Sequence, residues 1–178
     1  MTKQQNMKIP VKNKHDDFLI DYLLEKKFLV SGELGAALTE KFGVSEVYAR
    51  KIIERSVGKE LIRSSMPMTF SKGQYAYFPI QEKMTLDTIK RIAKQYRPPL
   101  YRLIEGLLQN SGILSYYEAV KITGTPAKRS NSKAEYLADL LEVLRTNNFI
   151  YQAADSNNVN YILLISAQEM ARNIETLI

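Results

Sequence analysis

The sequence predicts a mainly helical α+β fold that contains two copies of one unit, each made of three helices followed by a β-hairpin. Two observations predict this fold. Paired apolar residues recur after 84 residues in the first part of the unit and after 88 residues in its last part. Within each copy, helical apolar spacing gives way to short strand-like runs at the end. Unrelated helical segments would seldom reproduce both offsets, so we interpret the pattern as a repeat.

The repeat is visible in the apolar pairs themselves. They are Leu23-Leu24 with Leu107-Leu108, Leu29-Val30 with Ile113-Leu114, Ile52-Ile53 with Leu140-Leu141, and Leu61-Ile62 with Phe149-Ile150. The change of offset indicates a longer connection before the third helix of the second copy.

The first copy is expected to begin with a helix from about Asp16, whose carboxylate suits the positive end of the helix dipole. A short extended link then ends in Ser31, an expected N-cap, and a second helix over residues 33–42 stops at Gly43.

The third helix follows the N-cap Ser45, and its inward face is expected to hold Ala49, Ile52, Ile53 and Ser56. Residues 61–64 and 74–78 read as two strands joined by a connection over residues 65–73.

Capping boxes mark helix starts in the second half at Ser115–Glu118, Ser132–Glu135 and Ser166–Glu169. A second hairpin is expected from residues 150–152 and 160–164. The predicted organisation is a flexible basic arm (1–13), a first domain (14–80), a basic linker helix (81–97), a second domain (98–165) and a C-terminal helix (166–178).

Composition excludes several classes of function. The chain has 178 residues and no cysteine, so it has no disulfide, thiol nucleophile or thiolate metal site. Its one histidine, His15, lies in a lysine-rich segment, and no arrangement of nucleophile and base appears, so we expect no enzyme activity, metal or cofactor. No apolar run approaches a membrane span and no signal peptide is evident, which predicts a cytoplasmic protein without a membrane partner.

The net charge of +6 is unevenly distributed. Residues 1–80 carry a net +4, residues 81–97 a net +3 and residues 98–178 a net −1. The first half and the linker therefore favour a polyanionic partner.

The order helix, helix, turn, helix, hairpin resembles the winged helix-turn-helix domain of prokaryotic DNA-binding proteins. Phe42-Gly43-Val44-Ser45 is similar to the turn into a recognition helix, and Leu61-Ile62 and Phe149-Ile150 are similar to the last core pair before the wing. Two copies in tandem cover residues 14–165. The resemblance implies double-stranded DNA binding, by a transcriptional regulator or the DNA-targeting module of a larger system, and hence a nucleoid-associated location.

The resemblance also implies which residues contact DNA. In the third helix of the first copy these are Ser45, Glu46, Arg50, Lys51 and Arg55. Arg50 is the expected base reader, because a guanidinium pairs bidentately with guanine, whereas lysines mainly neutralise phosphate. The wing adds Thr69, Ser71, Lys72 and Gly73, which fit both a backbone contact and a plain turn.

Outside the first copy, the linker helix offers Lys90, Arg91 and Lys94. The second copy departs from the pattern, because Ala138, Asp139, Glu142 and Val143 replace Arg50, Lys51, Glu54 and Arg55. Phosphates would repel this acidic face. The loop with Lys128, Arg129 and Lys133 fits a phosphate contact or a solvated loop equally well.

The second copy or the C-terminal helix is therefore a candidate for self-association or a protein partner. An alternative for the whole chain is a tandem winged-helix scaffold, similar to the subunits of chromosome-condensing complexes. Most tyrosines are expected to pack rather than to stack on bases, among them Tyr48, Tyr75, Tyr77, Tyr136 and Tyr161.

Overall fold

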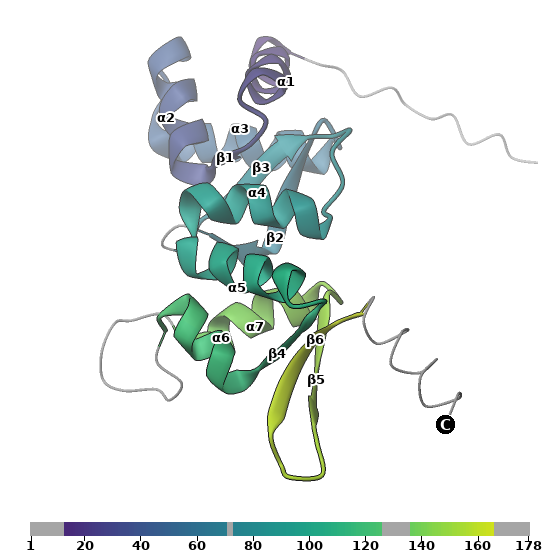
Figure 1. The fold of residues 1–178 in the computed structure, drawn as a ribbon. Helices are drawn as coiled ribbons and strands as arrows, with labels where there is room; N and C mark the ends of the chain where they lie inside the picture. The colour runs from purple at the N-terminus through teal and green to yellow at the C-terminus, as the bar shows by residue number, and fades with distance from the viewer. Residues whose placement is uncertain (1–12, 71–72, 126–135, 166–178) are drawn as a thin grey trace, which may run out of the picture. The chain divides into compact units, whose positions relative to one another are not determined.

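The computed structural model describes residues 13–70, 73–125 and 136–165, and it combines helices with small antiparallel sheets (Figure 1). The predicted mixture of helices and hairpins is confirmed. The chain divides into two compact units, residues 1–83 and 84–178.

The first unit is built from three helices and a three-stranded sheet. Its elements are α1 (Lys14–Lys26), β1 (Leu29–Val30), α2 (Ser31–Phe42), α3 (Glu46–Gly58), β2 (Ile62–Thr69) and β3 (Tyr75–Pro79). All strand pairs are antiparallel and the strand order is β1-β3-β2, so the expected extended link is the third strand of the sheet.

The second unit begins with one additional helix and then repeats the same order. Its elements are α4 (Leu86–Tyr96), α5 (Pro98–Gln109), β4 (Ile113–Ser115), α6 (Tyr116–Thr123), α7 (Leu137–Thr146), β5 (Ile150–Ala154) and β6 (Asn160–Leu164). The strand order β4-β6-β5 reproduces that of the first unit, and α4 packs against α5.

Backbone conformation repeats at the same offsets as the apolar pairs. Lys27 and Ser111, 84 residues apart, both have positive φ, at 73° and 55°. Glu60 and Asn148, 88 residues apart, both have φ of 56°. Non-glycine residues seldom adopt positive φ, so its recurrence at matching positions indicates the same chain path in both units.

The cores of the two units use matching positions. In the first unit Leu19, Leu23, Ile52 and Ile53 are buried, and their counterparts are Leu103, Leu107, Leu140 and Leu141. Burying each such side chain contributes about 1.5–3 kcal/mol. The face of α3 predicted to point inward, with Ala49 and Ser56 beside the two isoleucines, is confirmed.

Several predicted helix ends are confirmed. The Ser45 hydroxyl accepts a hydrogen bond from the Tyr48 amide at 3.3 Å, and Gly43 ends α2 in the left-handed conformation with φ of 65°. In the second unit Ser115 and Glu118 form the predicted capping box of α6.

Other predicted ends are wrong. Helix α1 begins at Lys14 instead of near Asp16, because the Asn13 side chain accepts from the amides of His15 and Asp16. Ser31 is not an N-cap but the first residue of α2, and its hydroxyl donates to the Tyr75 carbonyl oxygen at 3.2 Å. A tertiary contact with β3 therefore replaces the expected local one.

The first hairpin is longer than predicted. Strand β2 continues to Thr69, so most of the expected connection is strand, with an irregularity in its pairing to β3 between Ser64 and Thr69. The second hairpin agrees with the prediction. Helix α7 begins at Leu137 with Tyr136 as its N-cap, and the Ser132–Glu135 box lies outside the described residues, as does the predicted helix 166–178.

The packing predicted for tyrosines holds for Tyr77 and Tyr136, which are buried, but not for Tyr48, which is 41% exposed. Tyr48 lies in the first turn of α3, and its ring borders that of His15 of α1 with ring centroids 6.4 Å apart.

A buried polar cluster joins α1 to α3. The Asp16 carboxylate, 1% exposed, accepts from the Ser56 hydroxyl and from the Lys59 ammonium, each at 2.7 Å, and from the Asn13 amide at 3.2 Å. Burial acts to raise the pKa of Asp16, but these hydrogen bonds outweigh it and hold the pKa below its ordinary value. Asp16 therefore stays ionised and links the two helices.

Candidate nucleic-acid interface

Helix α3 presents three exposed cations, Arg50, Lys51 and Arg55. None of them forms an ion pair within the described part of the chain. Arg50 lies four residues from Glu46 on one side and four from Glu54 on the other, a spacing that places the three on one helix surface. Lys51 and Arg55 are also four residues apart and form a neighbouring row.

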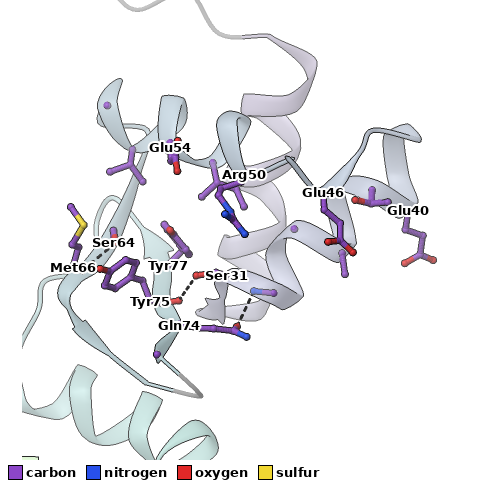
Figure 2. Close-up of a pocket in the computed structure, with 18 residues that line it drawn as sticks. Ser31, Glu40, Glu46, Arg50, Glu54, Ser64, Met66, Gln74, Tyr75 and Tyr77 are labelled. Carbon is purple, nitrogen blue, oxygen red and sulfur yellow. Dashed lines mark hydrogen bonds between the residues drawn. The ribbon is translucent and has the colours of Figure 1, made fainter. Parts of the chain in front are cut away.

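A groove of about 1170 Å³ runs along α3 in the first unit, between that helix, α2 and the β2–β3 hairpin (Figure 2). Residues of α3 that line it are Glu46, Arg50, Ile53, Glu54, Val57 and Gly58. Figure 2 shows Arg50 between the two glutamates, with Tyr75, Tyr77 and Met66 on the sheet side.

Two hydrogen bonds hold the opposite walls of the groove together. Besides the Ser31 bond to β3, the Gly32 amide donates to Gln74 Oε1 at 2.9 Å (Figure 2). A Cβ at Gly32 would lie 3.1 Å from that oxygen, so a side chain there would displace Gln74. The start of α2 is thereby fixed to the start of β3.

The structure divides the predicted site on α3 into two parts. Glu46 and Arg50 line the groove, whereas Lys51 and Arg55 do not. Ser45 is exposed, but its hydroxyl is already engaged as the N-cap.

Only part of the predicted wing contact lies within the described structure. Thr69 ends β2 and is half-buried, while Ser71 and Lys72 lie outside the described residues. Gly73 has φ of 78° and a Cβ there would meet no atom within 4 Å. The Phe70 amide donates to the Gln74 carbonyl oxygen at 2.7 Å across this turn, and the positive φ explains the choice of glycine with or without a DNA contact.

The basic residues of α4 differ from those of α3, because all three have partners inside the second unit. Lys90 pairs with Glu105 at 2.6 Å, and Arg91 pairs with Asp87 at 3.2 Å. Lys94 lies 5.9 Å from the centre of the Tyr101 ring. The hydrogen bond to Glu105 raises the pKa of Lys90. A phosphate would have to compete with these interactions.

Helix α7 occupies the position of α3 in the second unit. Ala138 and Glu142 are exposed, and Asp139 and Val143 are half-buried. Glu142 pairs with Arg145 on the same helix, so no exposed row of unpaired cations forms on α7. The predicted contacts Lys128, Arg129 and Lys133 lie outside the described residues.

Sequence reasoning missed several residues of the groove and of α3. Val47 is 68% exposed on the outer surface of α3, and Met66 is 66% exposed on β2. Glu40 adds a third carboxylate to the groove, and Gly35 leaves open space in its α2 wall. The apolar spacing of α3 could have identified Val47 as an outward-facing residue. The groove is formed by elements that are distant in sequence, so no local sequence pattern could have identified its lining residues.

No protein-family model, curated protein or solved structure matches the chain. Among the residues that the structure describes, no helix combines the length and apolar character needed to cross a membrane. The same residues contain no cluster of three histidine or carboxylate side chains suited to a metal ion.

Proposed function

We propose that the first unit is a winged-helix domain that binds double-stranded DNA, with α3 in the major groove and the β2–β3 hairpin beside the backbone. The observation that carries the proposal is the exposed surface of α3. Arg50, Lys51 and Arg55 lie there with no ion-pair partner among the described residues. Such cations are available to phosphate without first breaking an internal pair.

The arrangement of elements supports the same proposal. Two helices joined by the tight turn at Gly43 precede an antiparallel hairpin, and the strand order is β1-β3-β2. This order resembles that of winged-helix domains, which place the helix after the turn in the major groove. The fold alone does not imply DNA binding, so the charges on α3 are the stronger support.

The two parts of the α3 surface suit different contacts. Arg50 is the candidate base reader, since its guanidinium presents a fork of donors that matches the acceptor edge of guanine. Lys51 and Arg55 lie outside the groove and are candidate phosphate contacts. Glu46 limits the accepted sequences, because a carboxylate accepts only from donors such as the cytosine amino group.

The second unit is proposed to support or assemble the first. The surface of α7 favours this role, because Ala138, Asp139 and Val143 occupy the positions where the first unit has Arg50, Lys51 and Arg55. This surface also favours a second candidate function for the whole chain, a protein-interaction scaffold of a DNA-associated complex. On the leading proposal, the chain is a transcriptional regulator or the targeting module of a larger DNA-acting system.

The test is duplex binding by the full chain in a salt series, measured by fluorescence anisotropy. If Lys51 and Arg55 each neutralise one phosphate, together they contribute about −1.8 to the slope of log affinity against log salt. Replacing Lys51 or Arg55 by alanine should reduce the slope by about 0.9 for each variant. Arg50→Ala should also weaken the preference among duplex sequences.

Arg145→Ala is the matched control, because it removes the same charge from α7, where Arg145 already pairs with Glu142. It should leave duplex affinity unchanged. Absence of binding at low salt, or an equal loss in Arg145→Ala, would refute the proposal and favour the scaffold.

A further inference from the structure

The groove beside α3 is acidic although the chain as a whole is basic. Glu40, Glu46 and Glu54 line it together with one cation, Arg50, so its lining carries a net charge of −2. The three glutamates are exposed, and none forms an ion pair among the described residues. The groove is therefore suited to a cationic occupant.

The interior of the groove is apolar and open. Ala36, Val57 and Met66 line it beside two tyrosines of β3. Burial raises the pKa of Tyr77, and the charge of Glu54 acts in the same direction, so this ring stays neutral. An occupant that fits the groove combines apolar side chains for this interior with positive charges for the carboxylates.

We propose that the occupant is the chain's own N-terminal segment, residues 1–12, which binds the groove as an extended strand. The segment contains Lys3, Lys8 and Lys12 and no acidic residue. In residues 7–12, the apolar residues Met7, Ile9 and Val11 alternate with lysine or proline. In an extended chain, successive side chains point to opposite sides, so the apolar residues face the interior while the lysines remain at the rim.

Proline supports the extended conformation that the proposal requires. Pro10 fixes its own φ and disfavours helical dihedrals for Ile9 before it. The other terminal segment, residues 166–178, is a poorer match, because it has Glu169 and Glu175 with one arginine and a net charge of −1.

The point of attachment lies close to the acidic end of the groove. Asn13 caps α1, and the ring of His15 packs 4.6 Å from the Phe42 ring. Phe42 ends α2 only two residues after Glu40. Twelve extended residues reach at most roughly 40 Å, and a short tether gives effective concentrations on the order of millimolar. A weak intrinsic affinity is therefore sufficient for docking.

The test places a nitroxide on the segment of the full chain and contains no DNA, so its failure would leave the DNA proposal standing. The chain has no cysteine, so Gln5→Cys provides a single labelling site. Docking should broaden the NMR methyl signals of Ala36 and Met66, which line the groove. The broadening should fade in about 1 M salt, where the Debye length is about 3 Å.

Gly35 provides a blocking variant that preserves the fold. A Cβ at this helical position meets no atom within 4 Å, so leucine extends into the groove and also favours the helix. Gly35→Leu should abolish the broadening, whereas Gly35→Ala should retain most of it. Replacing the three groove glutamates by glutamine should lower the docked-to-free ratio about tenfold.

Absence of broadening in the unmodified groove would overturn the proposal. Broadening that persists in Gly35→Leu would also overturn it, since the segment would then be binding elsewhere. Retained circular dichroism in each variant confirms that the fold is intact.

Discussion

Replacing Asp16 by alanine removes the link between α1 and α3 and is expected to destabilise the first unit by about 2–3 kcal/mol. The carboxylate accepts from Ser56, Lys59 and the Asn13 amide, and hydrogen bonds to a charged group contribute about 1.5–3 kcal/mol each. The expected loss of stability is smaller than the sum of these three contributions, because two of the donors keep other partners. Ser56 also donates to the Ile52 carbonyl oxygen at 3.0 Å, and Lys59 retains 24% exposure to water.

The assay is native-state hydrogen exchange of the full chain, which reports each unit separately. A loss of 2–3 kcal/mol corresponds to roughly 30- to 150-fold faster exchange of the most protected α1 and α3 amides. Amides of α5 and α7 provide the internal control and should be unchanged. Equal acceleration in both units would refute the assignment of Asp16 to the first unit alone.

The corresponding positions of the second unit suggest a double substitution that should recover part of the stability lost in Asp16→Ala. At the offsets of 84 and 88, the counterparts of Asp16 and Ser56 are Leu100 and Leu144, both fully buried. Asp16→Leu combined with Ser56→Leu should therefore be more stable than Asp16→Ala, because apolar packing can replace a buried charged cluster. If the double variant exchanges faster than Asp16→Ala, the interpretation of the two sites as alternative solutions is wrong.

The pH dependence of stability at acidic pH provides an independent check on the role of Asp16. The pKa of Asp16 is lower in the folded chain than its ordinary value, so its contribution is complete above the unfolded pKa of about 3.9. The contribution is lost as pH falls through the folded pKa. Unfolding of the first unit below about pH 4 should therefore include a proton uptake that Asp16→Asn lacks.

Three further predictions concern other parts of the chain. Gly43→Ala should destabilise the first unit by about 1–2 kcal/mol, as measured by urea unfolding, because an L side chain is strained at its φ of 65°. Ser115→Ala should destabilise α6 by about 1 kcal/mol through its lost cap, and accelerated exchange confined to α6 would confirm it. Tyr77 should titrate above its ordinary pKa in NMR of ring carbons, and Glu54→Gln should reduce that shift, since the charge of Glu54 contributes to it.

The sequence predicted what depends on local or periodic signals. Apolar spacing gave the order of elements and the inward face of α3, and short-range chemistry gave the ends at Gly43, Ser45 and Ser115. The offsets of 84 and 88 proved informative because both units require the same buried positions. Predicting these features does not require knowing which distant segments of the chain contact one another.

Features that arise from distant contacts were not predictable in the same way. Asp16 was expected to serve the helix dipole, but its carboxylate is bonded to residues 40 and 43 positions away. Ser31 was expected to cap α2, but its hydroxyl reaches β3, 44 residues away. The groove combines two helices and two strands, and nothing in the sequence around Glu40 indicated that it would lie beside α3.

The two proposals together explain how acidic and basic groups can coexist beside α3. Free carboxylates at Glu46 and Glu54 would repel phosphates near the proposed reading surface. The N-terminal segment brings three lysines to a groove whose lining carries a net −2, so the occupied groove carries a net +1. Docking would therefore change the surface beside Arg50 from repelling to attracting DNA. Duplex affinity should then fall in Gly35→Leu at low salt, although this substitution removes no charge.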